Sequence, residues 1–278
     1  MKKRAVLFSL PGLWGRHCST HKKTERMDIS MPKLIVEACC GSADDVIEAQ
    51  KAGADRVELN SNLSLGGLTP SLGTLKVAKA ETGLPIMAMV RPRESGFLYT
   101  AAEFRTALLD AESLLANGAD GIVFGFLNAD GTVDAGRCRE ILRLAGEKQT
   151  VFHRAIDVVP DWRAAIDLLC ELGVTRILTS GQRASVFDGA ATVAEMIRYA
   201  HGRIEILPGG GIRTHNVREI VSKTGCTQIH ISPHRVCLDP SALGNPEIHF
   251  GLPGSHEDHY QILDANEFEK MRSLACAD

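Results

Sequence analysis

The sequence predicts a single-domain α/β protein, a (β/α)8 TIM barrel over residues 32–278. Short runs rich in Val, Ile and Leu alternate eight times with segments of helical periodicity. Apolar strands that alternate with amphipathic helices are typical of a parallel sheet covered by helices, and roughly 250 residues is the usual size of an eightfold barrel. An open doubly wound sheet is the alternative, but no GxGxxG turn follows the first predicted strand.

The eight predicted strands recur along the whole chain beyond residue 33. They cover residues 34–38, 56–60, 86–91, 121–126, 150–154, 176–180, 204–208 and 228–232. Helical segments such as SADDVIEAQKA and DWRAAIDLLCEL separate them. A glycine stands before each strand from the second onwards, at positions 53, 83, 118, 146, 173, 202 and 225. Glycine is expected just past a helix end because it adopts the left-handed backbone without strain.

The segment after the last predicted strand departs from this pattern. Residues 233–263 are rich in Pro, Gly and His, and we expect an ordered but irregular excursion near the barrel mouth. Asp264, with Glu267 three residues later, predicts the start of the closing helix EFEKMRSLA.

Composition and charge exclude several classes of function. The formal net charge of −3 shows no basic excess, so we expect no nucleic-acid partner. No apolar run approaches the roughly 20 residues that span a bilayer, so we expect no membrane partner. The eight cysteines show no CxxC spacing and are predicted to be reduced thiols in a cytoplasmic protein.

Residues 1–31 differ from the rest of the chain. They combine a basic cluster, a short apolar stretch broken by Pro11 and the polar run HKKTER, without an A-x-A cleavage site. We therefore predict a disordered extension rather than a secretory signal, with Met27 or Met31 as the natural start.

Titratable side chains gather at the predicted strand ends, where barrels of this kind place their active sites. The candidate catalytic residues are Glu37, Glu58, Arg91, His153 and Asp157. His153 is suited to proton exchange near neutral pH, and Asp157 is placed either to orient it or to pair with Arg154. A purely structural role is the alternative for each, because single buried polar residues are usually satisfied core groups.

A second group predicts an anion-binding site. Arg91 and Arg93 flank Pro92 and present planar forks suited to a carboxylate or phosphate, unless they pair with Glu37 or Glu58 across the barrel. PGGGI precedes a predicted helix, and its backbone N–H groups suit an anion. The other candidates for anion binding are Arg154, Ser180, Gly209, Gly210 and Gly211.

Several blocks together resemble the copper homeostasis protein CutC family. They are EACCGSADDVIEAQKAGADRVELNSNLSLGGLTPSLG, VRPR, GADGIVFGFLNADGTVD, TVFHRAID, RILTSG and PGGGI, in one order from Leu34 to the closing helix. The resemblance implies a cytoplasmic TIM barrel, a homo-oligomer and a link to copper handling, with Cu(I) as ligand. It implies no established reaction.

One departure from the family concerns the metal ligand. Members often carry cysteine at the ends of both the first and the second strand, a pair proposed to bind Cu(I). This chain keeps Cys39 but has Asn60 at the second position, and Cys40 is expected to face the opposite side of the strand. An amide is a poor ligand for Cu(I), so Cys39 is the one metal ligand that the pattern retains.

Two functions therefore remain open. The first is copper homeostasis with copper binding, which the resemblance implies. The second is a metal-independent barrel enzyme acting on a small anionic, phosphate- or carboxylate-bearing substrate, which the strand-end residues favour. A divalent metal held by Glu37, Glu58, His153 and His230 is a third arrangement, without ligand spacing to single it out.

Overall fold

A computed structural model describes residues 33–245, 247–248, 250 and 257–277, and the predicted extension over 1–31 lies outside them. Eight parallel strands form the sheet, in the order β7-β6-β5-β4-β3-β2-β1-β8. A parallel bridge between Gly209 and His230 joins the two ends of this order. The strands are β1 (Ile35–Cys40), β2 (Arg56–Leu59), β3 (Ile86–Met89), β4 (Gly121–Phe124), β5 (Gln149–Phe152), β6 (Arg176–Thr179), β7 (Glu205–Pro208) and β8 (Gln228–Ile231). The predicted (β/α)8 barrel is confirmed.

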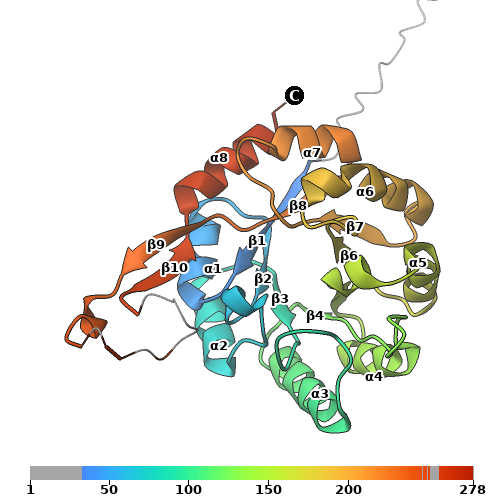
Figure 1. The fold of residues 1–278 in the computed structure, drawn as a ribbon, viewed down its shortest axis with the longest axis horizontal. Coiled ribbons are helices and arrows are strands. Elements are labelled where there is room, and N and C mark those ends of the chain that lie inside the picture. Colours follow the sequence, from blue (N-terminus) through green and yellow to red (C-terminus); the bar gives the residue numbers. More distant parts are fainter. Residues whose placement is uncertain (1–32, 246, 249, 251–256, 278) are drawn as a thin grey trace, which may run out of the picture. The chain divides into compact units, whose positions relative to one another are not determined.

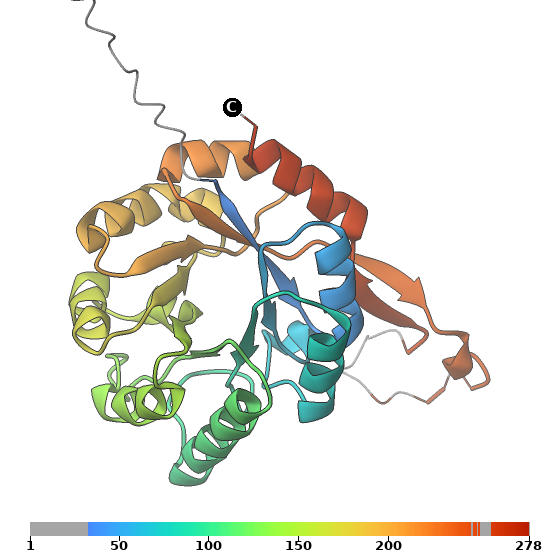
Figure 2. The same ribbon diagram turned by 180° about the vertical axis from the view of Figure 1, so that it is seen from behind.

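Eight helices surround the strands in chain order (Figure 1), and the same ring is seen from behind (Figure 2). In α5, residues Trp162, Ala165, Ile166 and Leu169 are buried, which is the spacing of one helix face turned to the sheet. The helices are α1 (Ala43–Lys51), α2 (Leu72–Glu81), α3 (Ala101–Ala116), α4 (Ala135–Ala145), α5 (Trp162–Glu171), α6 (Val186–Ala200), α7 (Val217–Thr224) and α8 (Ala265–Ala275).

Local signals fix where the helices begin and end. The Asp264 side chain accepts a hydrogen bond from the Glu267 N–H, which confirms the predicted start of α8. All the predicted helix-end glycines except Gly83 have positive φ. That expectation was wrong for Gly83, because α2 ends in an extended Thr82, which leaves no left-handed position to fill.

Alternation along the strands creates two cores. Outward-facing residues such as Val36, Ala38 and Cys40 pack under the helices in the larger cluster. A smaller cluster fills the barrel interior, consisting of Met87, Met89, Val123, Val151, Leu178 and Leu207. Other inward positions carry buried polar residues, among them Glu37, Glu58 and His230.

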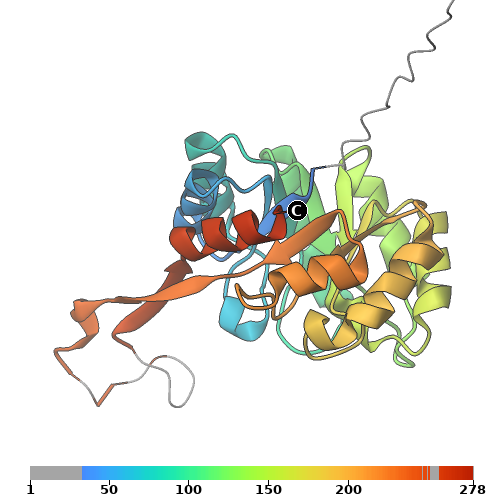
Figure 3. The same ribbon diagram turned by 90° about the horizontal axis from the view of Figure 1, so that it is seen from above.

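The excursion after β8 is more regular than expected. Strands β9 (His234–Leu238) and β10 (His259–Leu263) form an antiparallel hairpin, and a short helix, η3 (Pro240–Ala242), follows β9. This arm extends away from the barrel beyond α1 and α2 (Figures 1 and 3). The irregular structure expected from the Pro, Gly and His content is thus partly wrong, because β-branched and aromatic residues on both strands support pairing.

None of the helices in the described part of the chain is long and apolar enough to cross a membrane.

Candidate functional site

A cavity of about 430 Å³ opens at the carboxyl ends of the strands. It is lined by inward-facing residues from six strands or their ends, among them Cys39, Glu58, Met89, Arg91, His153 and His230. The sequence expected this location, because the loops after parallel barrel strands form one mouth. Four of the five candidate catalytic residues, including Asp157, line it, whereas Glu37 lies beneath.

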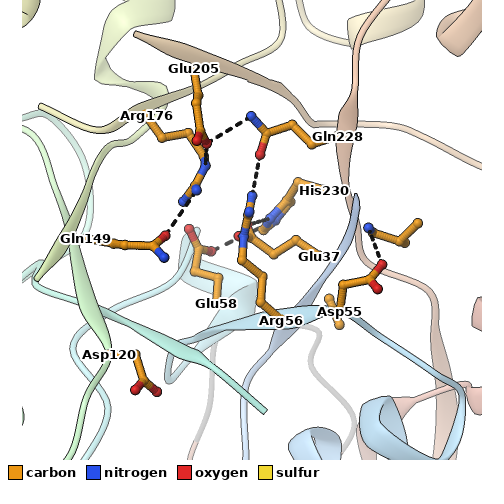
Figure 4. Close-up of polar contacts among 12 residues, drawn as sticks. Glu37, Asp55, Arg56, Glu58, Asp120, Gln149, Arg176, Glu205, Gln228 and His230 are labelled. Carbon is orange, nitrogen blue, oxygen red and sulfur yellow. Dashed lines mark hydrogen bonds and ion pairs between the residues drawn. The ribbon is translucent and has the colours of Figure 1, made fainter. Parts of the chain in front are cut away.

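Glu37 belongs to a polar network that crosses the barrel floor (Figure 4). It forms a buried ion pair with Arg56 and a hydrogen bond of 2.7 Å with His230 Nδ1. Burial alone would raise the pKa of Glu37, but Arg56 and His230 outweigh it and lower the pKa to about 2. Glu37 is therefore a charged structural anchor.

The network continues from Arg56 around the floor. Arg56 Nη2 donates to Gln228 Oε1 at 2.6 Å, and Gln228 Nε2 donates to Glu205 at 3.2 Å. Arg176 then joins Glu205 at 2.6 Å and Gln149 at 3.0 Å. Together with the Glu37–Arg56 ion pair, these side-chain contacts connect six strands.

Sequence reasoning missed Arg56, Arg176 and Gln228. All three stand at the beginnings of strands, and the search for site residues considered only the strand ends. The available signal was the period of two in RVELN, which places Arg56, Glu58 and Asn60 on one inward face.

Above the floor, Cys39, Glu58 and His230 converge. One ligand atom from each lies within 4.8 Å of the others. Burial would lower the pKa of His230, but the Glu58 carboxylate and hydrogen bonds to Cys39 and Glu37 raise it well above the ordinary value. Burial also raises the pKa of the Cys39 thiol and of Glu58. The cluster therefore holds protons that a bound cation would displace.

Asn60 lies directly beside this cluster. Its Nδ2 donates to Glu58 Oε2 at 2.9 Å and lies 3.7 Å from Cys39 Sγ. Cys40 is buried in the outer core, on the opposite side of β1 from Cys39, as the alternation predicts. The structure thus places Asn60 where a second thiolate would have faced the first.

His153 follows β5 and caps the short helix η2 (Arg154–Val158). Its Nδ1 accepts the Ala155 N–H at 3.2 Å, and its ring lies 4.8 Å from that of Phe97. Burial, followed by the Arg91 charge, lowers the pKa of His153 to about 3. The expected proton exchange near neutral pH is therefore wrong for this histidine, which stays neutral.

Arg91 anchors the loop after β2 rather than pairing with a carboxylate. Its guanidinium donates to the carbonyls of Leu65, Gly67 and Ser95 at 3.0, 2.9 and 2.8 Å. Neither Glu37 nor Glu58 is its ion-pair partner. Arg93 turns away to Glu103 at 2.7 Å and to loop carbonyls, and it does not line the cavity.

Asp157 lies in η2 and forms hydrogen bonds with residues at the start of the loop after β6. It accepts from Arg154 Nε at 2.8 Å, from Thr179 Oγ1 at 2.6 Å and from the Ser180 backbone at 3.0 Å. Of its two expected roles, the structure shows the pairing with Arg154. Arg154 also donates to Ser180 Oγ at 2.6 Å.

The glycine loop lies next to these residues. A Cβ on Gly210 would lie 3.3 Å from Arg154 Nη1, and one on Gly211 would lie 3.0 Å from Ser185 Cβ. Both glycines have positive φ, and Gly209 bridges to β8. Anion binding by this loop stays a prediction.

Comparison with known proteins now identifies the family. The CutC family profile matches residues 34–235. The chain belongs to the CutC family. A CutC family protein of Treponema denticola is 53% identical over 242 residues, which cover 87% of this chain and 98% of the relative. The human copper homeostasis protein cutC homolog is 40% identical over 241 residues, covering 87% and 88%.

Solved structures agree with this assignment. The crystal structure of a CutC protein from Streptococcus agalactiae superimposes with a TM-score of 0.68 at 34% identity, covering 71% of this chain and 97% of the other. A phosphonomutase-like protein from Burkholderia cenocepacia, at 13% identity and a TM-score of 0.53, shares the fold alone. The resemblance seen in the sequence is therefore confirmed.

Proposed function

We propose that this CutC family protein acts in copper homeostasis and binds a copper ion at Cys39, Glu58 and His230. The observation that carries this proposal is the convergence of their ligand atoms within 4.8 Å of one another. The names of the human and mouse relatives, copper homeostasis protein cutC homolog, support the biological setting.

The chemistry of the donor set fits copper. A thiolate is the ligand that Cu(I) prefers, and imidazole suits copper in both oxidation states. Met89 lines the same cavity and offers a thioether. The sequence alone left Cys39 without a partner; in the fold, His230 of β8 takes that place beside it, because β1 is hydrogen-bonded to both β2 and β8.

Competition with a Cu(I) chelator tests the proposal. Cys39→Ala removes the soft ligand, and we expect Cu(I) affinity to fall by a factor of roughly 100 or more, because the remaining imidazole and carboxylate include no thiolate, the ligand that Cu(I) prefers. Cys40→Ala is the matched control, since the neighbouring thiol faces the outer core. Equal Cu(I) affinity of the natural protein and Cys39→Ala would refute the proposal.

Two further parts of the proposal concern the setting of the protein. We propose a cytoplasmic location, which is supported by the free state of the cysteines in the described part of the chain.

We also propose a homo-oligomer in which the β9–β10 arm of one copy packs on another copy. Val236, Leu238 and Tyr260 of the arm are 60%, 59% and 54% exposed, and an isolated two-stranded hairpin is only marginally stable in water.

A further inference from the structure

Unsatisfied polar atoms gather in the mouth cavity. Among the described residues, four buried side-chain atoms without a hydrogen-bond partner belong to its lining: Glu58 Oε1, Asn60 Oδ1, Arg91 Nε and His153 Nε2. A buried polar atom without a hydrogen-bond partner is energetically unfavourable. A larger hollow of about 730 Å³ between α1 and the arm contains one such atom, His234 Nε2. The unmet hydrogen bonds therefore point to a ligand at the mouth.

Arg91 indicates the charge of that ligand. Its side chain is buried, and it donates three hydrogen bonds to neutral backbone carbonyls. Within the part of the chain that the structure describes, no carboxylate lies within ion-pair distance of it. The nearby Tyr99 hydroxyl supplies no negative charge, because burial raises its pKa above the ordinary value. A buried cation without a counter-ion is strongly unfavourable, so the ligand carries a negative group.

His153 supplies a second donor on the same wall. Because Nδ1 accepts the Ala155 N–H, the ring proton of the neutral imidazole lies on Nε2. Phe97 contacts both donors, with its ring centroid 4.8 Å from that of His153 and 5.6 Å from Arg91 Cζ. Two donors and one positive charge match the two oxygens of a carboxylate.

Strand β2, in contrast, presents hydrogen-bond acceptors to the cavity. Asn60 Nδ2 donates to Glu58 Oε2, which leaves Asn60 Oδ1 as a free acceptor, and Glu58 Oε1 is likewise without a hydrogen-bond partner. Acceptors of this kind are satisfied by hydroxyl groups of a ligand.

We propose that the mouth cavity binds a small hydroxycarboxylate, with its carboxylate at Arg91 and His153 and a hydroxyl at Asn60. A cavity of about 430 Å³ lies within the usual range for small-molecule sites. Apolar side chains of Leu63, Phe97 and Leu178 enclose the remaining space. This ligand is the kind of molecule that an enzyme with a small anionic substrate would use, and its binding does not depend on copper.

Calorimetric titration of the metal-free full-length protein, in the presence of a chelator, tests this inference. D-Glycerate is the probe, propionate lacks its hydroxyls, and inorganic phosphate replaces the carboxylate. We expect D-glycerate to bind about tenfold or more tightly than either, because both sets of unpaired atoms are then satisfied.

Three variants locate the binding. Arg91→Gln and His153→Asn should each weaken D-glycerate binding by about 10- to 100-fold, the usual effect of losing a hydrogen bond to a charged group. Asn at 153 can still accept the Ala155 N–H, so this variant remains informative if Arg91→Gln fails to fold. Arg163→Gln, at an exposed ion pair with Glu195, should bind as the natural protein does.

Several results would overturn the inference. They are no D-glycerate binding at millimolar concentration, equal binding of D-glycerate and propionate, tighter binding of phosphate, or unchanged affinity in His153→Asn. Because copper is absent throughout, failure here leaves the copper proposal standing, and loss of copper binding in Cys39→Ala leaves this one standing.

Discussion

At the scale of single residues, burial decides what His153 does. Its imidazole packs against Gly125, where any side chain would collide with the ring. The pKa of about 3 keeps it a neutral hydrogen-bond donor rather than a proton carrier. Its location could be predicted from the sequence, but its protonation could not, because desolvation depends on the neighbours that the fold supplies.

The lowered pKa of His153 predicts a pH-dependent stability. The unfolded histidine binds a proton near pH 6.5, whereas the folded one does so only near pH 3. Its contribution to stability is therefore complete above pH 6.5 and is lost as the pH falls towards 3. Urea unfolding between pH 4.5 and 6.5 gives the free energy of unfolding as a function of pH. In His153→Asn, the slope of this free energy against pH should be smaller than in the natural protein by up to about 1.4 kcal/mol per pH unit. His201→Asn, an exposed control, should keep the slope of the natural protein; equal slopes for all three proteins would contradict the assignment.

In the proposed copper site, we expect Asn60 to limit how tightly Cys39 holds Cu(I). Asn60→Cys places a second thiol where the amide now lies 3.7 Å from Cys39 Sγ. We expect Cu(I) affinity to rise by a factor of about 10 or more, because two thiolates suit Cu(I) better than one. Chelator competition measures the change. Unchanged affinity in the variant would show that Cu(I) does not bind between these two strands.

Alternation along single strands could be predicted, but partners across strands could not. The period of two correctly separated Cys39 from Cys40. The pairing of Glu37 with Arg56 depends on the register between β1 and β2, in which these two residues are opposite each other. The sequence of one strand does not contain that register. The sequence analysis therefore offered Arg91, rather than Arg56, as a possible ion-pair partner of Glu37.

At the scale of elements, the β9–β10 arm is the part that the barrel pattern did not predict. The connection between its two strands is long, so no short hairpin turn marked it in the sequence. Strand positions β1 to β8, by contrast, follow from repeated apolar runs of similar length. The arm carries exposed apolar side chains that the barrel does not cover.

The proposed role of the arm predicts a change in assembly. Val236→Asp combined with Leu238→Asp should shift the protein to a smaller oligomer in light scattering, because buried carboxylates at an interface are costly. Leu109→Asp on α3 is the control, since Leu109 is likewise 63% exposed. If the double variant keeps the mass of the natural protein, the arm is not the contact.

At the scale of the whole molecule, the polar floor joins the ends of the sheet order. Arg56, Gln228 and Glu205 link β2, β8 and β7 inside the barrel. Arg56→Met leaves Glu37 buried without its main counter-charge, and we expect a loss of about 3–5 kcal/mol in urea unfolding. Arg203→Met, at an exposed pair with Asp167, should change stability by less than about 1 kcal/mol. Similar losses of unfolding free energy in both variants would show that the buried pair at the floor stabilises the protein no more than an exposed pair does.

In our proposal, copper binds between β1, β2 and β8 at the barrel mouth. A crystal of the Cu(I)-loaded protein, measured at the copper absorption edge, tests it most directly. We predict one anomalous difference peak in contact with Cys39 Sγ and a ring nitrogen of His230, and no such peak in Cys39→Ala. Copper density elsewhere in the natural protein, or a peak at the mouth that persists without the Cys39 thiol, would contradict the claim.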